Sequence, residues 1–205
     1  MSCCDHDRPL AHTGAQRRVL WAVLFVNLLI FLGEFGAGLW GRSTALQSDS
    51  LDSVGDAIVY GVSLLVVGGT VRARAGAALL KGVVQLGFAA AILGEVVHRA
   101  LAGPSPMAVV MAWAAAAALL ANASCMLLLA PYRTQDLNMR SVWLCSRNDV
   151  VSNVAVLLTT ALLTLTDWGW LDLVFGGAVA LLFAITGARV GAAATRDLRS
   201  AASTH

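Results

Sequence analysis

Residues 51–65, LDSVGDAIVYGVSLL, place two carboxylates, Asp52 and Asp56, directly before a run of apolar residues. The uninterrupted apolar part of this run extends over 13 residues, 57–69. At ~1.5 Å per residue it spans roughly 20 Å, whereas the hydrocarbon core of a bilayer is ~30 Å thick. A membrane helix at this position must therefore begin earlier in the chain and take both carboxylates into the bilayer.

The composition favours a membrane protein. The 205-residue chain is 58% hydrophobic and only 13% charged, whereas soluble domains are about 25% charged. It contains six apolar stretches, each close to the ~20 residues that cross a hydrocarbon core. We predict an all-α membrane protein in which residues 19–190 form six transmembrane helices, with tails at 1–18 and 191–205. The expected spans are 19–41, 45–69, 75–97, 107–131, 139–165 and 168–190.

Basic residues are distributed unevenly between the two sides of this predicted bundle. With a cytoplasmic N-terminus, the inner segments carry ten of the 14 Lys and Arg residues and the outer loops carry two. Cytoplasmic loops of membrane proteins are enriched in Lys and Arg, so both termini are predicted to be cytoplasmic. No cluster is dense enough to follow a phosphate backbone, and no nucleic-acid partner is expected. The inner ten are Arg8, Arg17, Arg18, Arg72, Arg74, Arg133, Arg140, Arg189, Arg196 and Arg199.

A second stretch, LCSRNDVVSNVAVLL at 144–158, shares Leu, Ser, Asp, Leu and Leu with residues 51–65 at five matching offsets. In this correspondence Cys145 matches the first carboxylate and Asp149 the second. The two stretches lie in the second and fifth predicted spans, which run in opposite directions. This pattern indicates a 3+3 inverted repeat, which in transporters places the binding site near the membrane midplane.

Four side chains in these two stretches have the spacing of a metal site. Residues four apart lie on one face of a helix, one turn from each other. Asp52 and Asp56 from one helix can therefore meet Cys145 and Asp149 from the other and bind a divalent metal tetrahedrally. Ionisable groups at this depth cost about 2.5–3.5 kcal/mol each on insertion scales, so function is their default explanation.

Two cations within the predicted spans provide an alternative use for these carboxylates, because an ion pair with Lys81 or Arg147 would neutralise charge without binding metal. Arg147 lies two residues from both Cys145 and Asp149, so a regular helix directs it away from the ligand face. We interpret it as the partner of Asp136 or as a side chain that snorkels toward the inner interface. Cys145 has a separate alternative, since a lone Cys in an apolar helix commonly packs as a small hydrophobic residue.

Further polar residues lie inside or before the predicted spans. Glu34, with Asn27 two turns earlier, is in the first span, and Asp49 precedes the ligand pair in the second. We predict that these three support the ligands or relay protons, the alternative for Glu34 being a plain interhelical hydrogen bond. Asn122 in the fourth span is expected to make such an interhelical bond.

The N-terminal segment CCDHD, residues 3–7, combines two thiols, an imidazole and two carboxylates, all suitable ligands for soft or borderline metals. We predict that Cys3, Cys4 and His6 capture metal for delivery to the pore; an inert tail is the alternative. The predicted cytoplasmic position of this tail argues for reduced thiols.

The chain resembles the cation diffusion facilitator family of divalent-metal/proton antiporters over about residues 19–190. The resemblance implies a six-helix transporter whose central site pairs an acid or His with an Asp four residues later, on the second and fifth helices. The matching pairs here are Asp52 with Asp56 and Cys145 with Asp149, where zinc-type members often have His in one pair. The stretches that carry the resemblance are NLLIFLGEFGAGLWGRSTAL (27–46), SDSLDSVGDA (48–57), WLCSRNDVVSN (143–153) and GWLDLVFGGAVALLFA (169–184).

The resemblance implies export of divalent metal ions from the cytoplasm in exchange for protons, by a homodimer formed through transmembrane helices in a bacterial cytoplasmic membrane. Many members also have a C-terminal ferredoxin-like domain, which we expect this chain to lack. A thiolate ligand favours softer ions, so Zn²⁺ or Cd²⁺ is expected, Fe²⁺, Co²⁺ and Ni²⁺ stay open, and Mg²⁺ and Ca²⁺ are not expected.

The alternative function is that of a non-transporting membrane protein that binds or senses metal with the same ligands. An enzyme is not expected, because the sequence contains neither G-x-S-x-G nor H-E-x-x-H. No prosthetic group is expected either, since the metal ion would be the cargo.

Overall fold

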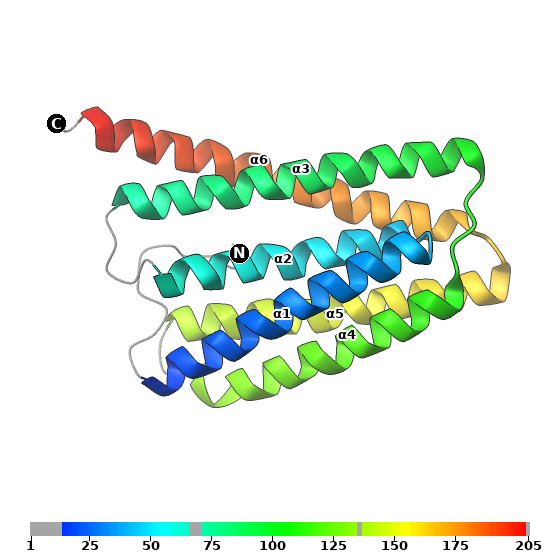
Figure 1. The fold of residues 1–205 in the computed structure, drawn as a ribbon, viewed down its shortest axis with the longest axis horizontal. Helices are drawn as coiled ribbons and strands as arrows, with labels where there is room; N and C mark the ends of the chain where they lie inside the picture. The colour runs from blue at the N-terminus through cyan, green and yellow to red at the C-terminus, as the bar shows by residue number, and fades with distance from the viewer. Residues whose placement is uncertain (1–13, 66–70, 135–136, 204–205) are drawn as a thin grey trace.

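The computed structural model describes residues 14–65, 71–134 and 137–203. All regular structure in these ranges is helical, and each predicted span coincides with one of six long helices, which confirms the all-α prediction (Figure 1). A short 3-10 turn, η1 (Ala130–Tyr132), follows the fourth helix. The six helices are α1 (Gly14–Trp40), α2 (Thr44–Leu65), α3 (Val71–Ala102), α4 (Ala108–Leu129), α5 (Leu137–Thr166) and α6 (Trp170–Ser203).

Two helices continue from the predicted spans into the predicted tails. Helix α1 begins at Gly14 and α6 continues to Ser203, into the segments predicted as tails. The last part of α6 is rich in Ala and also carries two Arg residues; both residue types are strong helix formers, so the helix continues although its sequence has become polar. Helix α6 therefore continues beyond the end of its apolar segment.

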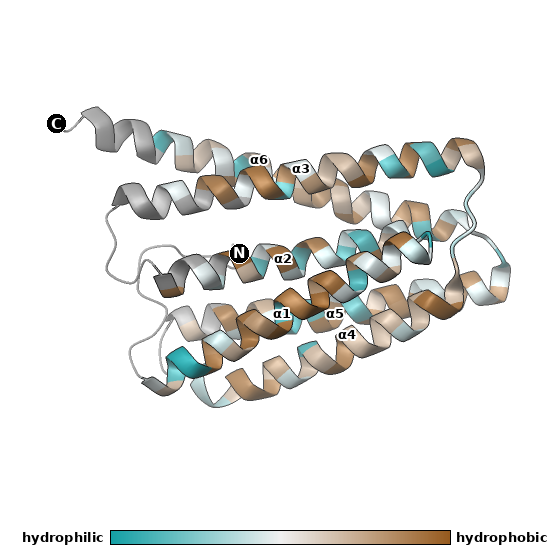
Figure 2. Cartoon of the chain, in the orientation of Figure 1, coloured by the Kyte–Doolittle hydropathy of each residue, from teal (hydrophilic) through white to brown (hydrophobic). Residues whose placement is uncertain are grey.

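Within the described ranges, five helical segments are long and apolar enough to cross a bilayer. Helix α2 is also long enough, since its 22 residues extend ~33 Å, but it carries Asp49, Asp52 and Asp56. Large apolar side chains cover the outside of the bundle, and apolar colour dominates the surrounding helices in Figure 2. The five segments are Gly14–Trp40, Gly82–Ala102, Ala108–Tyr132, Val142–Thr166 and Trp170–Arg196.

The polar helix α2 occupies the centre of the bundle, where it contacts every other long helix. Helices α1, α2, α4 and α5 form one group, and α3 packs mainly against α6 beside this group (Figure 1). The backbones of α3 and α6 approach closely at Gly82, where a Cβ atom would lie 3.0 Å from the Gly187 carbonyl oxygen. The surrounding helices thus shield the carboxylates of α2 from lipid.

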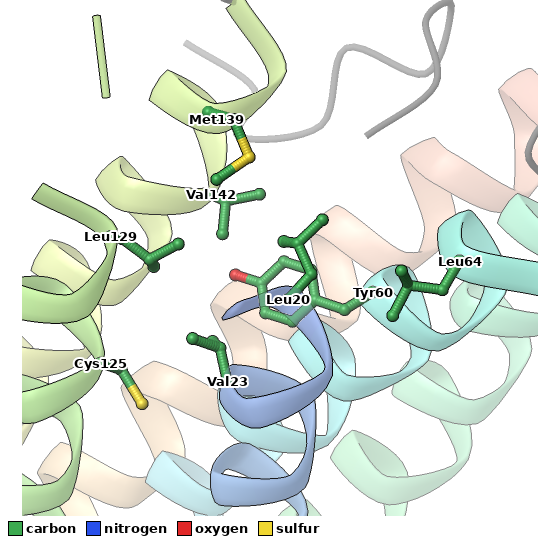
Figure 3. Packing of buried hydrophobic residues seen from close by; sticks show 8 residues of the cluster. All are labelled: Leu20, Val23, Tyr60, Leu64, Cys125, Leu129, Met139 and Val142. Atoms are coloured by element: carbon green, nitrogen blue, oxygen red, sulfur yellow. The ribbon is translucent and has the colours of Figure 1, made fainter. Parts of the chain in front are cut away.

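The bundle has two ends, which we name by their connections. The turn end carries the α1–α2, α3–α4 and α5–α6 connections, and the terminal end carries the start of α1 and the end of α6 (Figure 1). At the terminal end a buried apolar cluster joins α1, α2, α4 and α5, with the Tyr60 ring among its members (Figure 3). We call this the terminal-end cluster; it consists of Leu20, Val23, Tyr60, Leu64, Cys125, Leu129, Met139 and Val142.

At the turn end, α6 holds the start of α2 through one fully buried carboxylate, Asp172. It accepts hydrogen bonds from the backbone N–H groups of Thr44 at 2.7 Å and Ala45 at 3.2 Å, and from the Ser43 hydroxyl at 2.5 Å. The first N–H groups of a helix have no partner within it and carry partial positive charge. Asp172 therefore stabilises the N-terminus of α2 and joins it to α6.

Candidate metal-transport site

The predicted ligands lie on α2 and α5, which contact each other and run in opposite directions (Figure 1). Asp56, Cys145 and Asp149 are buried, at 4%, 7% and 4% exposure, and Asp52 is half-buried. The i, i+4 spacing on each helix directs both members of a pair to one face. The structure therefore places these four residues on neighbouring helices in the interior of the bundle.

Interactions between the side chains show that the two pairs approach each other. The Asp149 carboxyl group hydrogen-bonds that of Asp52 and lies within electrostatic range of Asp56. Neither Asp149 oxygen receives a hydrogen bond from an amide or hydroxyl group in the part of the chain that the structure describes. Two carboxyl groups in contact need a proton or a cation between them, because two buried negative charges repel. The two helices are therefore in contact through one predicted ligand of each pair, Asp52 and Asp149.

No three of the described His, Cys, Asp and Glu residues are gathered closely enough to hold a metal ion in this structure. The carboxyl contact between Asp52 and Asp149 is present, but the complete set of four ligands around one point is not. The coordination sphere that we predicted from the spacing therefore stays a prediction.

Tyr60, which the sequence analysis did not single out, is part of the same region. Its hydroxyl group donates a hydrogen bond of 2.8 Å to Asp56 Oδ2, and it lies within electrostatic range of Cys145 and Asp149. Its ring belongs to the terminal-end cluster. The i, i+4 spacing from Asp56 was the signal that could have identified it.

A second polar group lies beside the predicted ligands, toward the turn end. Asp49 accepts hydrogen bonds from Ser152 Oγ and from Asn153 Nδ2. Asn153 Nδ2 also donates to Glu34 Oε1 at 3.2 Å, and Asn153 Oδ1 accepts from Asn122 Nδ2 at 2.9 Å. This network joins α1, α2, α4 and α5, and the interhelical role expected of Asn122 is present.

Asn27 is buried on α1 but stands apart from this network. Its side-chain amide donates to the Val23 carbonyl oxygen of its own helix at 2.9 Å. Its Oδ1 atom is buried and receives no hydrogen bond among the described residues. Of the three polar residues predicted near the ligands, Glu34 and Asp49 therefore come together, and no described hydrogen bond joins Asn27 to them.

Arg147 is exposed while Cys145 and Asp149 on the same helix are buried, so it points away from the ligand face as predicted. Its guanidinium lies 6.0 Å from the centre of the Trp143 ring, over which Arg133 also lies at 5.2 Å. A cation over an aromatic face is stabilised without a carboxylate. Its proposed partner Asp136, the Lys81 side chain and the tail residues Cys3, Cys4 and His6 lie outside the described residues.

Comparison with known proteins agrees with this architecture. The model of the cation efflux transmembrane domain matches residues 20–199. The chain belongs to the cation efflux family. Two relatives within the family are a metal cation efflux system protein CzcD from Cupriavidus metallidurans and a cation efflux system protein CzcD from an Alcaligenes strain. Each is 24% identical over 180 residues, which cover 82% of this chain and 56% of the relative.

Membership of the cation efflux family confirms the predicted resemblance to cation diffusion facilitators, whose members are transporters and not enzymes. Together with the five apolar helices, it makes the chain a multi-pass integral membrane protein. The chain spans little more than half the length of the two curated relatives.

Proposed function

We propose that the chain exports divalent transition-metal cations, with Zn²⁺ and Cd²⁺ as the first candidates, from the cytoplasm in exchange for protons. The observation that carries this proposal is the contact between the Asp52 and Asp149 carboxyl groups, on two antiparallel helices inside a cation efflux domain. The names of the two relatives, both cation efflux proteins, support the same direction of transport.

Asp52, Asp56, Cys145 and Asp149 are the proposed metal ligands. Carboxylates and thiolates bind metal only after losing their protons, so metal and protons compete for one cavity. Metal entering from the cytoplasm would displace protons, and protons arriving from the other side would later displace the metal. A thiolate among the ligands favours Zn²⁺ and Cd²⁺ over hard ions, while Fe²⁺, Co²⁺ and Ni²⁺ are secondary candidates.

The terminal end is the proposed cytoplasmic side. Arg17, Arg18, Arg133, Arg189 and Arg196 lie toward this end, whereas Arg42 and Arg99 lie toward the turn end. Positive residues concentrate on the cytoplasmic side of membrane proteins. The terminal-end cluster then lies between the proposed ligands and the cytoplasm, and its helices must separate to admit metal. The predicted 3+3 repeat is consistent with such rocking of helices around a central site.

Three further parts of the proposal concern the assembly and the chain ends. A homodimer formed through the membrane helices in a bacterial cytoplasmic membrane is the proposed functional unit. Residues 1–18 and 191–205 are proposed as cytoplasmic segments, although α6 continues as a helix into the second. Cys3, Cys4 and His6 are proposed to capture metal ahead of the pore.

The test is metal transport by the purified chain in proteoliposomes, with a pH gradient and a metal-sensitive dye. The parent chain should move Zn²⁺ or Cd²⁺ faster when the opposing proton gradient is imposed. Asp56→Ala and Asp149→Ala should abolish this flux, while Asp167→Ala, at an exposed residue of the turn end, should leave it intact. Metal binding without flux in the parent would support the sensor function instead.

A further inference from the structure

Glu34 on α1 and Asp49 on α2 form an acid pair beside the proposed metal ligands. Their side chains hydrogen-bond each other, and the two residues are 2% and 3% exposed. Glu34 Oε2 receives no hydrogen bond from an amide or hydroxyl group among the described residues. A hydrogen bond between two carboxyl groups requires that one of them carries a proton. The geometry of this pair is therefore that of a site that holds one proton.

The groups around the pair stabilise one negative charge but not two. The donors are neutral: Ser152 and Asn153 donate to Asp49, and Asn153 donates also to Glu34. Among the Lys and Arg residues whose side chains the structure describes, a set that does not include Lys81, none forms an ion pair with either carboxylate. The ionisable groups that face the pair are themselves acids, Asp52 toward Glu34 and Asp149 toward Asp49. A second negative charge in this apolar bundle would be unfavourable, because it would be buried without a described counter-charge.

On each helix that contributes to it, the pair lies closer to the turn end of the bundle than the proposed metal ligands do. Asp49 lies three residues before Asp52 on α2, and Asn153 lies four residues after Asp149 on α5. Both offsets correspond to about one helical turn, ~5 Å, toward the turn end. Glu34 is also in the turn-end half of α1, six residues before its last residue, Trp40. A proton that travels from the turn end toward the metal site therefore reaches the pair first.

We propose that Glu34 and Asp49 form a proton-binding site, distinct from the metal ligands, through which protons enter from the turn end during metal export. In its resting state the pair holds one proton and one negative charge. A proton from the turn-end solution makes the pair neutral and passes to a ligand carboxylate as the metal leaves. The pair thereby returns to its single charge. This inference rests on the proposed function, because it requires proton-driven export.

The test uses Glu34→Gln and Asp49→Asn in the full chain, because each amide has nearly the size of the acid that it replaces but cannot hold the shared proton. Metal affinity of the purified variants should stay within about threefold of the parent value, since the ligands are unchanged. Proton-driven flux in proteoliposomes should fall at least about tenfold and should lose its rise with turn-end acidity, as expected when a relay group is removed. The matched control is Glu95→Gln, at a half-buried glutamate near the turn end of α3, which should behave as the parent.

An independent measurement is the infrared spectrum of protonated carboxyl groups, to which the Asp52–Asp149 contact contributes a band that should stay in both variants. The parent should show a further band from the Glu34–Asp49 pair, which either substitution should remove. Retention of this band, or parental flux with parental pH dependence in both variants, would show that the pair is only an interhelical hydrogen bond. Loss of metal affinity by more than about tenfold in both variants would place the pair within the metal site and overturn its separate role. Absence of flux in the parent chain would instead refute the proposed function itself.

Discussion

Tyr60 Oη donates a hydrogen bond of 2.8 Å to Asp56 Oδ2, and both side chains are buried on the same face of α2. The bond fixes the orientation of one proposed metal ligand from the side of the terminal-end cluster. Polar groups that orient metal ligands typically contribute 10–100-fold to metal affinity. The phenol is therefore expected to matter for metal binding although it is not itself a proposed ligand.

Tyr60→Phe should weaken Zn²⁺ binding by about 10–100-fold while the protein stays folded, because only the hydroxyl group is removed. Titration of the purified protein with Zn²⁺ measures the change. Tyr132→Phe, at the other tyrosine of the chain, is the control and should bind as the parent. Equal affinities for parent and Tyr60→Phe would mean that Asp56 is oriented without this bond.

Cys145→Ser should lower the preference for Cd²⁺ over Zn²⁺, because a hydroxyl group is a harder ligand than a thiolate. The ratio of the two transport rates in proteoliposomes is the measurement. Cys125 is the matched control, since it is a second buried cysteine but belongs to the apolar terminal-end cluster. If Cys125→Ser changes the ratio as much as Cys145→Ser does, the thiolate has no special role in selectivity.

Gly176→Ala should destabilise the protein, because α6 approaches the start of α2 too closely for a side chain. A Cβ atom at Gly176 would lie 2.5 Å from the carbonyl carbon of Thr44. Overpacking of this kind costs about 1–3 kcal/mol. Gly177→Ala is the control, because its Cβ would meet only Val96 at an ordinary 3.7 Å. Thermal unfolding in detergent should show a lower midpoint for the first variant alone.

Asp172→Asn should also lower the unfolding midpoint, by a different mechanism. The substitution removes the negative charge that faces the N-terminus of α2 and weakens its bonds to the N–H groups of Thr44 and Ala45. Loss of such a cap costs about 0.5–2 kcal/mol. Asp167→Asn is a fitting control, since Asp167 is exposed and its φ of 52° suits Asn equally well. Similar midpoints for the two variants would contradict the capping role.

Much of the predicted site follows from local sequence. The i, i+4 spacing of Asp56 from Asp52 and of Asp149 from Cys145 places each pair on one helix face whatever surrounds the helix. Arg147 lies two residues from both Cys145 and Asp149, so the same periodicity directs its side chain outward. The interactions with Tyr60, Ser152 and Asn153 were not predicted. The packing of several helices decides whether the side chains of Tyr60, Ser152 and Asn153 meet the acidic residues or other side chains.

The sequence by itself determined the number, approximate limits and polarity of the helices, because hydropathy and helical periodicity are properties of consecutive residues. It also required the carboxylates of residues 51–65 to enter the bilayer, since the apolar run after them is too short. Only the tertiary structure decided that α2 lies at the centre of the bundle, that Asp172 caps it from 128 residues away, and that Glu34 meets Asp49. These contacts arise from side-chain packing between helices, which the order of residues along any one helix does not specify.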